Sequence, residues 1–167
     1  MPSATASRSM PVGRPNLAAR LTALGERAVA GLGALAPLVD LYIRWTVAIA
    51  FFKSGLTKIA SWETTVALFQ DEYHVPLLPL ELAAFLGTGV ELVFPVLLLL
   101  GLGSRFAAFV LFVFNIIAVV SYPDLGEVAL KDHYTWGLLL LVTLLHGPGA
   151  LSLDRLIRRY LLRNGRA

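Results

Sequence analysis

The sequence predicts an all-α integral membrane protein, a bundle of four membrane-spanning helices. Hydrophobic residues make up 57% of the chain and charged residues only 15%, whereas soluble domains carry about 25% charged residues. Four apolar runs lie at about 38–59, 79–101, 104–121 and 132–147, and each is close to the ~20 residues that a helix needs to cross a bilayer. A soluble bundle would need a polar stripe on each helix, but LFVFNIIAVV and GLLLLVTLL are apolar on every side.

Residues 1–37 are expected to form a disordered start followed by an amphipathic helix on the membrane surface. Residues 1–15 are small and contain proline, and apolar residues between Leu17 and Leu35 recur at spacings of three and four. That spacing is typical of an interfacial helix. A cleaved signal peptide is the alternative, but Pro37 directly follows the candidate cleavage site and disfavours cleavage.

The connections between the runs predict local structure as well. The segment 60–78 places apolar residues among acids and is expected to form a short interfacial helix, ended by Pro76 and Pro79. The turn GLGSR, residues 101–105, is so short that it joins the second and third spans as an antiparallel hairpin.

The distribution of basic residues predicts that both termini are cytoplasmic. The connections 60–78 and 122–131 hold one basic residue, Lys131, among five acids. Ten arginines lie in the other segments outside the runs: Arg8, Arg14, Arg20, Arg27, Arg105, Arg155, Arg158, Arg159, Arg163 and Arg166. Such a bias marks the cytoplasmic side. The expected organisation is a four-span domain at 38–155 in a bacterial inner membrane, followed by a basic cytoplasmic tail at 156–167.

Ionisable residues inside the predicted spans are the candidate functional residues. They are Arg44, Lys53 and Lys58 in the first span and Glu81 and Glu91 in the second. A charge at this depth costs a few kcal/mol and needs a partner. Arg44 and Lys58 share one helix face, and Lys53 points almost opposite. We expect Arg44 to pair with Glu91 and Lys58 to pair with Glu81, while Lys53 extends toward the interface or contacts another subunit.

This buried polar cluster has two interpretations. The pairs can serve only to fix the register of the helices, a known use of buried polar groups. Alternatively, Glu91 and Arg44 line a polar cavity for a quinone head group, an anion or a proton path. The sequence leaves both open.

Other polar residues support weaker hypotheses. His74 and His133 are candidate metal ligands that could meet near acidic residues, although interfacial hydrogen bonding is the commoner role for such histidines. Asn115 is expected to hydrogen-bond between helices. The chain has no cysteine, which excludes disulfides, thiolate metal sites and thiol catalysis by its own residues. Nucleic acid is not an expected partner, because the basic residues flank the spans.

The order of these residues resembles the DoxX family of small four-span membrane proteins. The matching pieces are Arg44, the stretch SGLTKI at 54–59, the stretch GVELVFPVLLLLGLGSR ending at Arg105, and HGPGALSLD at 146–154. Within them, the positions that match the family pattern are Gly55, Lys58, Glu91, Gly101, Arg105, Gly149, Ser152 and Asp154. The resemblance covers about residues 38–155.

The resemblance implies a membrane subunit of a redox complex, with a possible quinone contact and no catalysis by this chain alone. Some members are similar to the small subunit of a thiosulfate:quinone oxidoreductase, and others are associated with complexes that counter oxidative stress. The lipid bilayer and either a partner protein or further copies of the chain are the expected partners. Two alternatives stay open: a non-catalytic scaffold or assembly partner of a metal- or stress-related system, and a small-molecule transporter.

Overall fold

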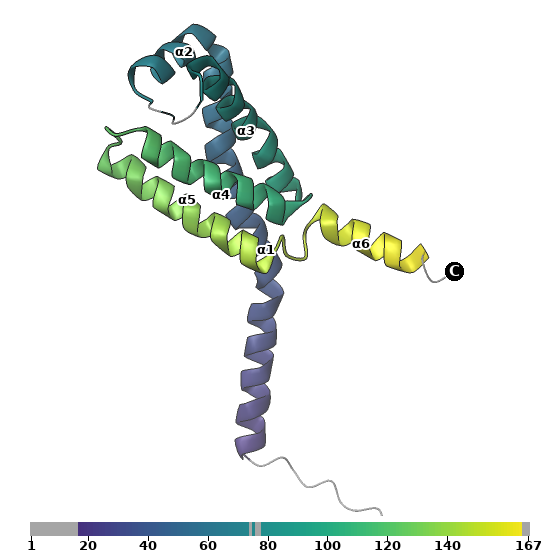
Figure 1. The fold of residues 1–167 in the computed structure, drawn as a ribbon. Coiled ribbons are helices and arrows are strands. Elements are labelled where there is room, and N and C mark those ends of the chain that lie inside the picture. Colours follow the sequence, from purple (N-terminus) through teal and green to yellow (C-terminus); the bar gives the residue numbers. More distant parts are fainter. Residues whose placement is uncertain (1–16, 74, 76–77, 165–167) are drawn as a thin grey trace, which may run out of the picture. The chain divides into compact units, whose positions relative to one another are not determined.

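The computed structural model describes residues 17–73, 75 and 78–164, and within them every regular element is a helix. The order along the chain is α1 (Leu17–Ala60), α2 (Trp62–Asp71), α3 (Leu80–Leu100), α4 (Ser104–Ser121), α5 (Glu127–His146) and α6 (Leu153–Asn164) (Figure 1). In this part of the chain, α1, α3, α4 and α5 are long and apolar enough to cross a membrane. The predicted all-α fold with four spans is therefore confirmed.

The chain divides into two compact units between Leu35 and Ala36. α1 runs through this point without a break and continues past Pro37, which lies inside the helix. In the first unit, the apolar side chains of Leu17, Leu21 and Leu24 are exposed. The described part of the first unit is therefore helical up to the boundary, and its position on a membrane surface stays a prediction.

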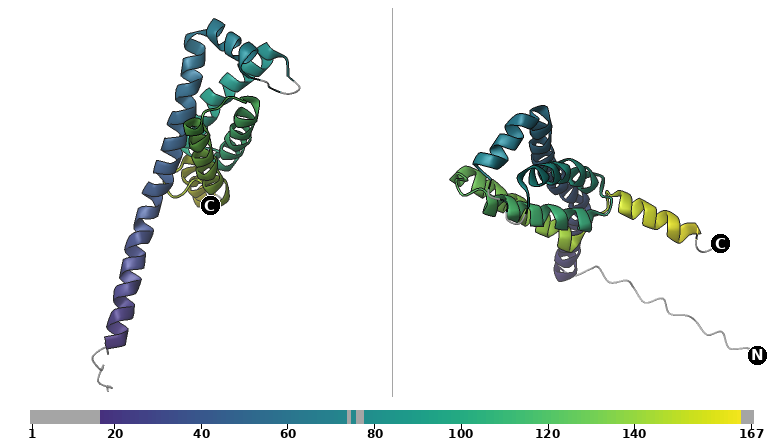
Figure 2. Two further views of the ribbon diagram at one scale, coloured as in Figure 1. Left: turned by 90° about the vertical axis from the view of Figure 1, so that its left-hand side faces the viewer. Right: turned by 45° about the horizontal axis from the view of Figure 1, so that its top comes forward.

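The second unit packs its helices around small residues. α4 packs against α3 and α5, and α2 packs against α3 (Figure 2). Residues of four helices form the buried core: Val47, Phe51, Leu98, Ala107, Ala108, Leu111 and Leu140. Alanines at such contacts let helix backbones approach closely, which is how helices associate in lipid.

Large apolar side chains cover the outside of this unit. Phe85, Phe106 and Val120 are each more than 60% exposed, whereas the charged residues Arg44 and Glu91 are only 1% and 5% exposed. In water this arrangement would expose large apolar patches. Lipid favours it, because apolar side chains can face the hydrocarbon while polar groups find partners inside.

The tight turn between α3 and α4 depends on left-handed glycines. Gly101 has φ of 72° and ends α3, and its N–H lies within hydrogen-bonding distance of the carbonyls of Leu97 and Leu98. The Leu102 N–H donates to Leu97 O at 3.0 Å, which completes a Schellman-type cap. Gly103, with φ of 55°, then begins α4. The predicted hairpin and the short helix in 60–78, which is α2, are both present.

Candidate functional site

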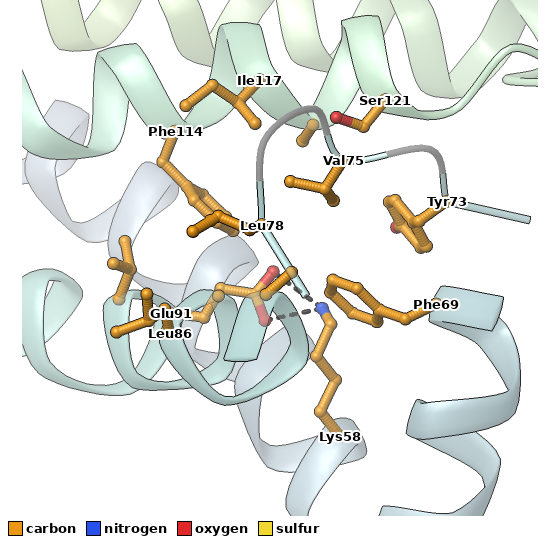
Figure 3. A pocket seen from close by; sticks show the side chains of 14 residues that line it. Lys58, Phe69, Tyr73, Val75, Leu78, Leu86, Glu91, Phe114, Ile117 and Ser121 are labelled. Atoms are coloured by element: carbon orange, nitrogen blue, oxygen red, sulfur yellow. Dashed lines mark hydrogen bonds and ion pairs between the residues drawn. The ribbon is translucent and has the colours of Figure 1, made fainter. Parts of the chain in front are cut away.

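A buried ion pair lies between α1 and α3. Lys58 Nζ donates to both carboxylate oxygens of Glu91, at 2.8 Å for Oε1 and 2.6 Å for Oε2 (Figure 3). Ser54, one helical turn before Lys58, donates from Oγ to Glu91 Oε1 at 3.1 Å and accepts from Lys58 Nζ at 2.9 Å. The side chains of Lys58 and Glu91 are only 11% and 7% exposed. The two opposite charges therefore neutralise each other away from the surface.

A glycine in α1 sets the level at which Glu91 meets its partner. A Cβ on Gly55 would lie 3.1 Å from Glu91 Cβ and 2.9 Å from Leu92, so α1 and α3 come into close contact at Gly55. Lys58 lies one turn beyond Gly55 on the same face, and its flexible chain reaches back to Glu91. Gly55 thus gives the side chains of Glu91 and Leu92 room against α1, and Lys58 places a cation within reach of the carboxylate.

The expected Arg44–Glu91 pair is wrong. Arg44 lies about three turns, roughly 16 Å, before Gly55 along α1, too far to reach Glu91. The prediction failed because the limits of an apolar run do not reveal the relative level of two helices. α1 begins at Leu17, well before the predicted span. Depths counted from the first residue of the apolar run therefore did not give the level of Arg44 relative to α3.

Arg44 instead binds backbone carbonyls at the other end of the bundle. Its guanidinium donates to Leu99 O at 3.0 Å, to Leu98 O at 3.3 Å, and to Leu151 O. The first two are carbonyls in the last turn of α3, and Leu98 O also accepts from the Gly101 N–H at 3.2 Å. A cation at this end of the helix also interacts favourably with the helix dipole. Arg44 is therefore a buried cap that joins α1, α3 and the segment before α6.

The other two candidate charges, Glu81 and Lys53, lie at the surface. Glu81 is exposed in the first turn of α3, where a carboxylate complements the helix dipole. The expected Lys58–Glu81 pair is therefore wrong, because Lys58 is bound to Glu91. Lys53 is exposed on α1, which agrees with the prediction that it points away from the Lys58 face.

The ion pair forms part of the wall of an apolar cavity of about 180 Å³. α2, α3, α4 and the segment between α2 and α3 supply the other walls, with aromatic rings from Phe69, Tyr73 and Phe114 (Figure 3). Ser121 also lines the cavity, and its buried Oγ has no hydrogen-bond partner within the described residues. The cavity thus combines an apolar interior with a carboxylate–ammonium pair and a free hydroxyl group.

A second cavity, of about 150 Å³, shares Glu91, Tyr73 and Phe114 with the first. Tyr122 and His133 line it as well. Burial, with the nearby carboxylates of Glu91 and Glu72, raises the pKa of Tyr73. The hydrogen bond from Tyr122 Oη to Glu72 likewise raises the pKa of Tyr122. Since both shifts favour the protonated phenol, both tyrosines are neutral at neutral pH. Glu91 is therefore flanked by neutral hydroxyl groups toward the α2 end of the bundle.

The histidines do not form a metal site in the part of the chain that the structure describes, where no group of three potential ligands occurs. His133 Nδ1 lies 2.8 Å from Asn115 Oδ1, and Asn115 Nδ2 donates to the His133 carbonyl at 3.0 Å. The prediction that Asn115 links helices is confirmed, since these bonds join α4 to α5. His74 lies outside the described residues.

The other positions that match the DoxX family pattern lie together at the end of the bundle that contains Arg44. Gly101 lies against Arg44 and Ser152, and a Cβ on Gly101 would come within 2.6 Å of Arg44 and 2.5 Å of Ser152. Asp154 accepts from the N–H groups of Gly103 and Ser104 at 2.9 and 3.1 Å and so caps α4. Two positions complete the cluster: Gly149, packed against Asp40, and Arg105, which donates to Leu145 O at 3.2 Å.

Two polar residues of the site, Ser54 and Ser121, were not predicted from the sequence. Ser54 precedes Lys58 by four residues, so helical spacing alone places both on one face. Ser121 follows Phe114 by seven residues, which likewise puts them on one face of α4. These spacings do not reveal what each hydroxyl faces. Ser54 meets Glu91 because Gly55 lets α3 pack closely against α1, and Ser121 lines the cavity.

Comparison with known proteins places these features in a family. The family model described as DoxX matches residues 39–123. A Haemophilus influenzae protein described as "Uncharacterized protein" is 36% identical over 128 residues, which cover 71% of this chain and 83% of the relative. No solved structure matches the chain. With its four apolar helices, the chain is a multi-pass membrane protein that belongs to the DoxX family.

Proposed function

We propose that this protein is a membrane subunit of a quinone-linked redox complex and that the cavity beside Lys58 and Glu91 binds the quinone head group. The observation that supports the proposal most directly is the free, buried hydroxyl of Ser121 in the wall of an otherwise apolar cavity. A buried donor without a partner is costly, and a ligand carbonyl would satisfy it.

The size and lining of the cavity fit one aromatic ring. An apolar protein cavity of about 150 Å³ holds a benzene molecule, so about 180 Å³ suits a single substituted ring. Phe69, Tyr73 and Phe114 supply ring faces and edges for stacking against it. Most binding cavities for larger molecules measure about 300–1,000 Å³, so a long isoprenoid tail would have to extend out between the helices into lipid.

The polar residues have separate roles in this proposal. A quinone takes up two electrons and two protons when it is reduced to a quinol. Ser121 would orient the ring through a hydrogen bond to a carbonyl, and Glu91 would exchange a proton with the bound ligand. Lys58 would stabilise the carboxylate form of Glu91, and Ser54 would hold that carboxylate in place. The electrons would come from a partner protein, because the chain has no cysteine for thiol redox chemistry.

A matched pair of glycines tests the binding site. A Cβ on Gly87 would meet Phe69 and Phe114 at 3.6 Å, an ordinary contact at the cavity wall, whereas a Cβ on Gly89 would meet nothing within 4 Å. We expect Gly87→Leu to fill the cavity and to weaken binding of a short-chain quinone at least tenfold, while Gly89→Leu leaves binding unchanged. Quenching of tryptophan fluorescence in nanodiscs measures this binding. Equal affinities of both variants and the native chain would contradict the proposed site.

A second comparison tests the role of Glu91. We expect Glu91→Gln to slow quinone reduction in membranes that contain the partner enzyme, and Lys53→Gln, on the exposed face, to leave the rate unchanged. If deletion of the gene removes the partner from membranes, and both variants restore quinone reduction in full, the chain acts as a scaffold. Flux of a small molecule into liposomes that contain this chain alone would instead indicate a transporter.

A further inference from the structure

Four basic side chains from three helices line one open cavity at the Arg44 end of the bundle. They are Arg105 at the start of α4, His146 at the end of α5, and Arg155 and Arg158 in α6, and the cavity measures about 650 Å³. Asp154 also lines this cavity, but both of its oxygens accept backbone N–H groups from α4. The cavity therefore presents mainly positive charge.

The backbone holds α6 at this position. The Asp154 N–H donates to Gly101 O at 2.9 Å, and the Asp154 carboxylate caps α4. Arg105 is held as well, because it donates to Leu145 O and packs against Gly147, where a Cβ would lie 3.3 Å from Arg105 Nε. The basic residues of α4 and α6 therefore meet through a built junction between helices.

α6 has the surface of a helix that lies in a membrane interface. Its residues were predicted only as the end of the four-span domain and a basic tail, yet they form twelve residues of helix. Five exposed apolar residues share one face, namely Leu153, Leu156, Ile157, Tyr160 and Leu161. Four arginines lie on the opposite face, namely Arg155, Arg158, Arg159 and Arg163, with Leu162 as the apolar exception among them. A helix of this type lies in the interface with its apolar face in the acyl boundary.

We propose that α6 lies in the head-group layer and that Arg105, His146, Arg155 and Arg158 bind the phosphate of an anionic phospholipid. Guanidinium groups form paired hydrogen bonds with phosphate oxygens, and basic pockets beside membrane-spanning helices suit anionic head groups. Phe106, which also lines the cavity and is 65% exposed, offers an apolar surface for the acyl chain. This site is separate from the proposed quinone site.

Two double variants of α6 with the same change in charge test the proposal. Arg155→Gln/Arg158→Gln removes two residues of the cavity, and Arg159→Gln/Arg163→Gln removes two arginines of the same helix outside it. Native mass spectrometry of the full chain in detergent counts bound phosphatidylglycerol, with phosphatidylcholine of the same acyl chains as the zwitterionic probe. Unchanged melting temperatures in detergent without lipid show that both variants are folded.

We expect the native chain to bind phosphatidylglycerol at least tenfold more tightly than phosphatidylcholine. A direct guanidinium–phosphate contact is a charge-assisted hydrogen bond, so the cavity variant, which loses two of them, should bind phosphatidylglycerol at least tenfold more weakly. The control variant should stay within about twofold of the native chain. Equal binding of the two lipids, or equal losses in the two variants, would overturn the proposal. Binding of inorganic phosphate without preference for phosphatidylglycerol would overturn it too, and would identify a site for free phosphate.

Discussion

At the scale of single residues, each buried charge discussed above has a partner, but the two charges of α1 are satisfied differently. Lys58 is neutralised by the carboxylate of Glu91, whereas Arg44 keeps its charge and binds carbonyl groups. In a membrane the difference matters, because a charge without a partner there costs a few kcal/mol. Each arrangement therefore predicts its own response to mutation.

Removal of one partner of the ion pair should be worse than removal of both. Lys58→Met leaves Glu91 buried and unpaired, and we expect it to destabilise the protein by about 3–5 kcal/mol. The double variant Lys58→Met/Glu91→Gln should recover at least half of that loss, because no charge remains buried. Unfolding in mixed micelles of increasing SDS content measures both values. Lys53→Met, at the exposed face, is the control and should change stability little; a double variant as unstable as Lys58→Met would contradict the pairing.

Arg44 and Glu91 should act independently on stability. Arg44→Ala removes the guanidinium that donates to the carbonyls of Leu98 and Leu99 and is expected to be destabilising. Because the two side chains do not touch, combining it with Glu91→Gln should give the sum of the single effects within about 0.5 kcal/mol. The same unfolding measurement gives the coupling energy. A rescue in the double variant would indicate the direct pair that the sequence favoured.

At the scale of elements, the contacts depend on where helices end and how closely they approach. The turn between α3 and α4 brings Gly101 against Ser152 and Arg44, and the same turn receives the cap from Asp154. The family-pattern residues at this end are thus neighbours, because the turn between α3 and α4 is hydrogen-bonded to the start of α6. Their spacing in the sequence reflects a junction of three helices.

Alanine substitutions at Gly101 and Gly103 can distinguish the cost of backbone strain from the cost of steric overlap. Both have positive φ, but a Cβ on Gly103 would meet nothing within 4 Å, whereas a Cβ on Gly101 would lie 2.8 Å from the Cα of Ser152. Gly103→Ala should therefore cost only the strain of the left-handed conformation, about 1–2 kcal/mol. Gly101→Ala adds steric overlap and should cost about 2–5 kcal/mol. Thermal unfolding in detergent measures the stability of both variants. Equal losses of stability would mean that the backbone at Ser152 moves to make room for the new Cβ at no cost.

At the scale of the whole molecule, two polar sites lie at different levels of one bundle. Residues of α2 line the cavity beside the ion pair, whereas the basic cavity is lined by residues near the end of α5 and the starts of α4 and α6. We propose that the basic end is cytoplasmic, since Arg105 and the arginines of α6 lie there. The proposed quinone site would then lie nearer the opposite, non-cytoplasmic face of the membrane.

Cysteines introduced by mutation test this orientation. Because the native chain has no cysteine, a thiol reagent can label only the introduced residue. Asp124→Cys lies between α4 and α5, and Leu102→Cys lies in the turn between α3 and α4; both positions are exposed. A membrane-impermeant maleimide should label Asp124→Cys in intact spheroplasts and should label Leu102→Cys only after lysis. The reverse pattern would place the arginines outside and would reject the proposed topology.

Hydropathy and turn length were sufficient to predict the four spans, the hairpin and α2, because each depends on residues close together in the chain. The same local reasoning identified Lys58 and Glu91 as buried charges and placed Lys53 on another face. It paired Glu91 with Arg44, which was wrong: the partner is Lys58, and the choice depends on the relative level of α1 and α3, which the sequence does not give. The close contact at Gly55, the carbonyls that end α3 and the free hydroxyl of Ser121 emerge only when the helices are packed together.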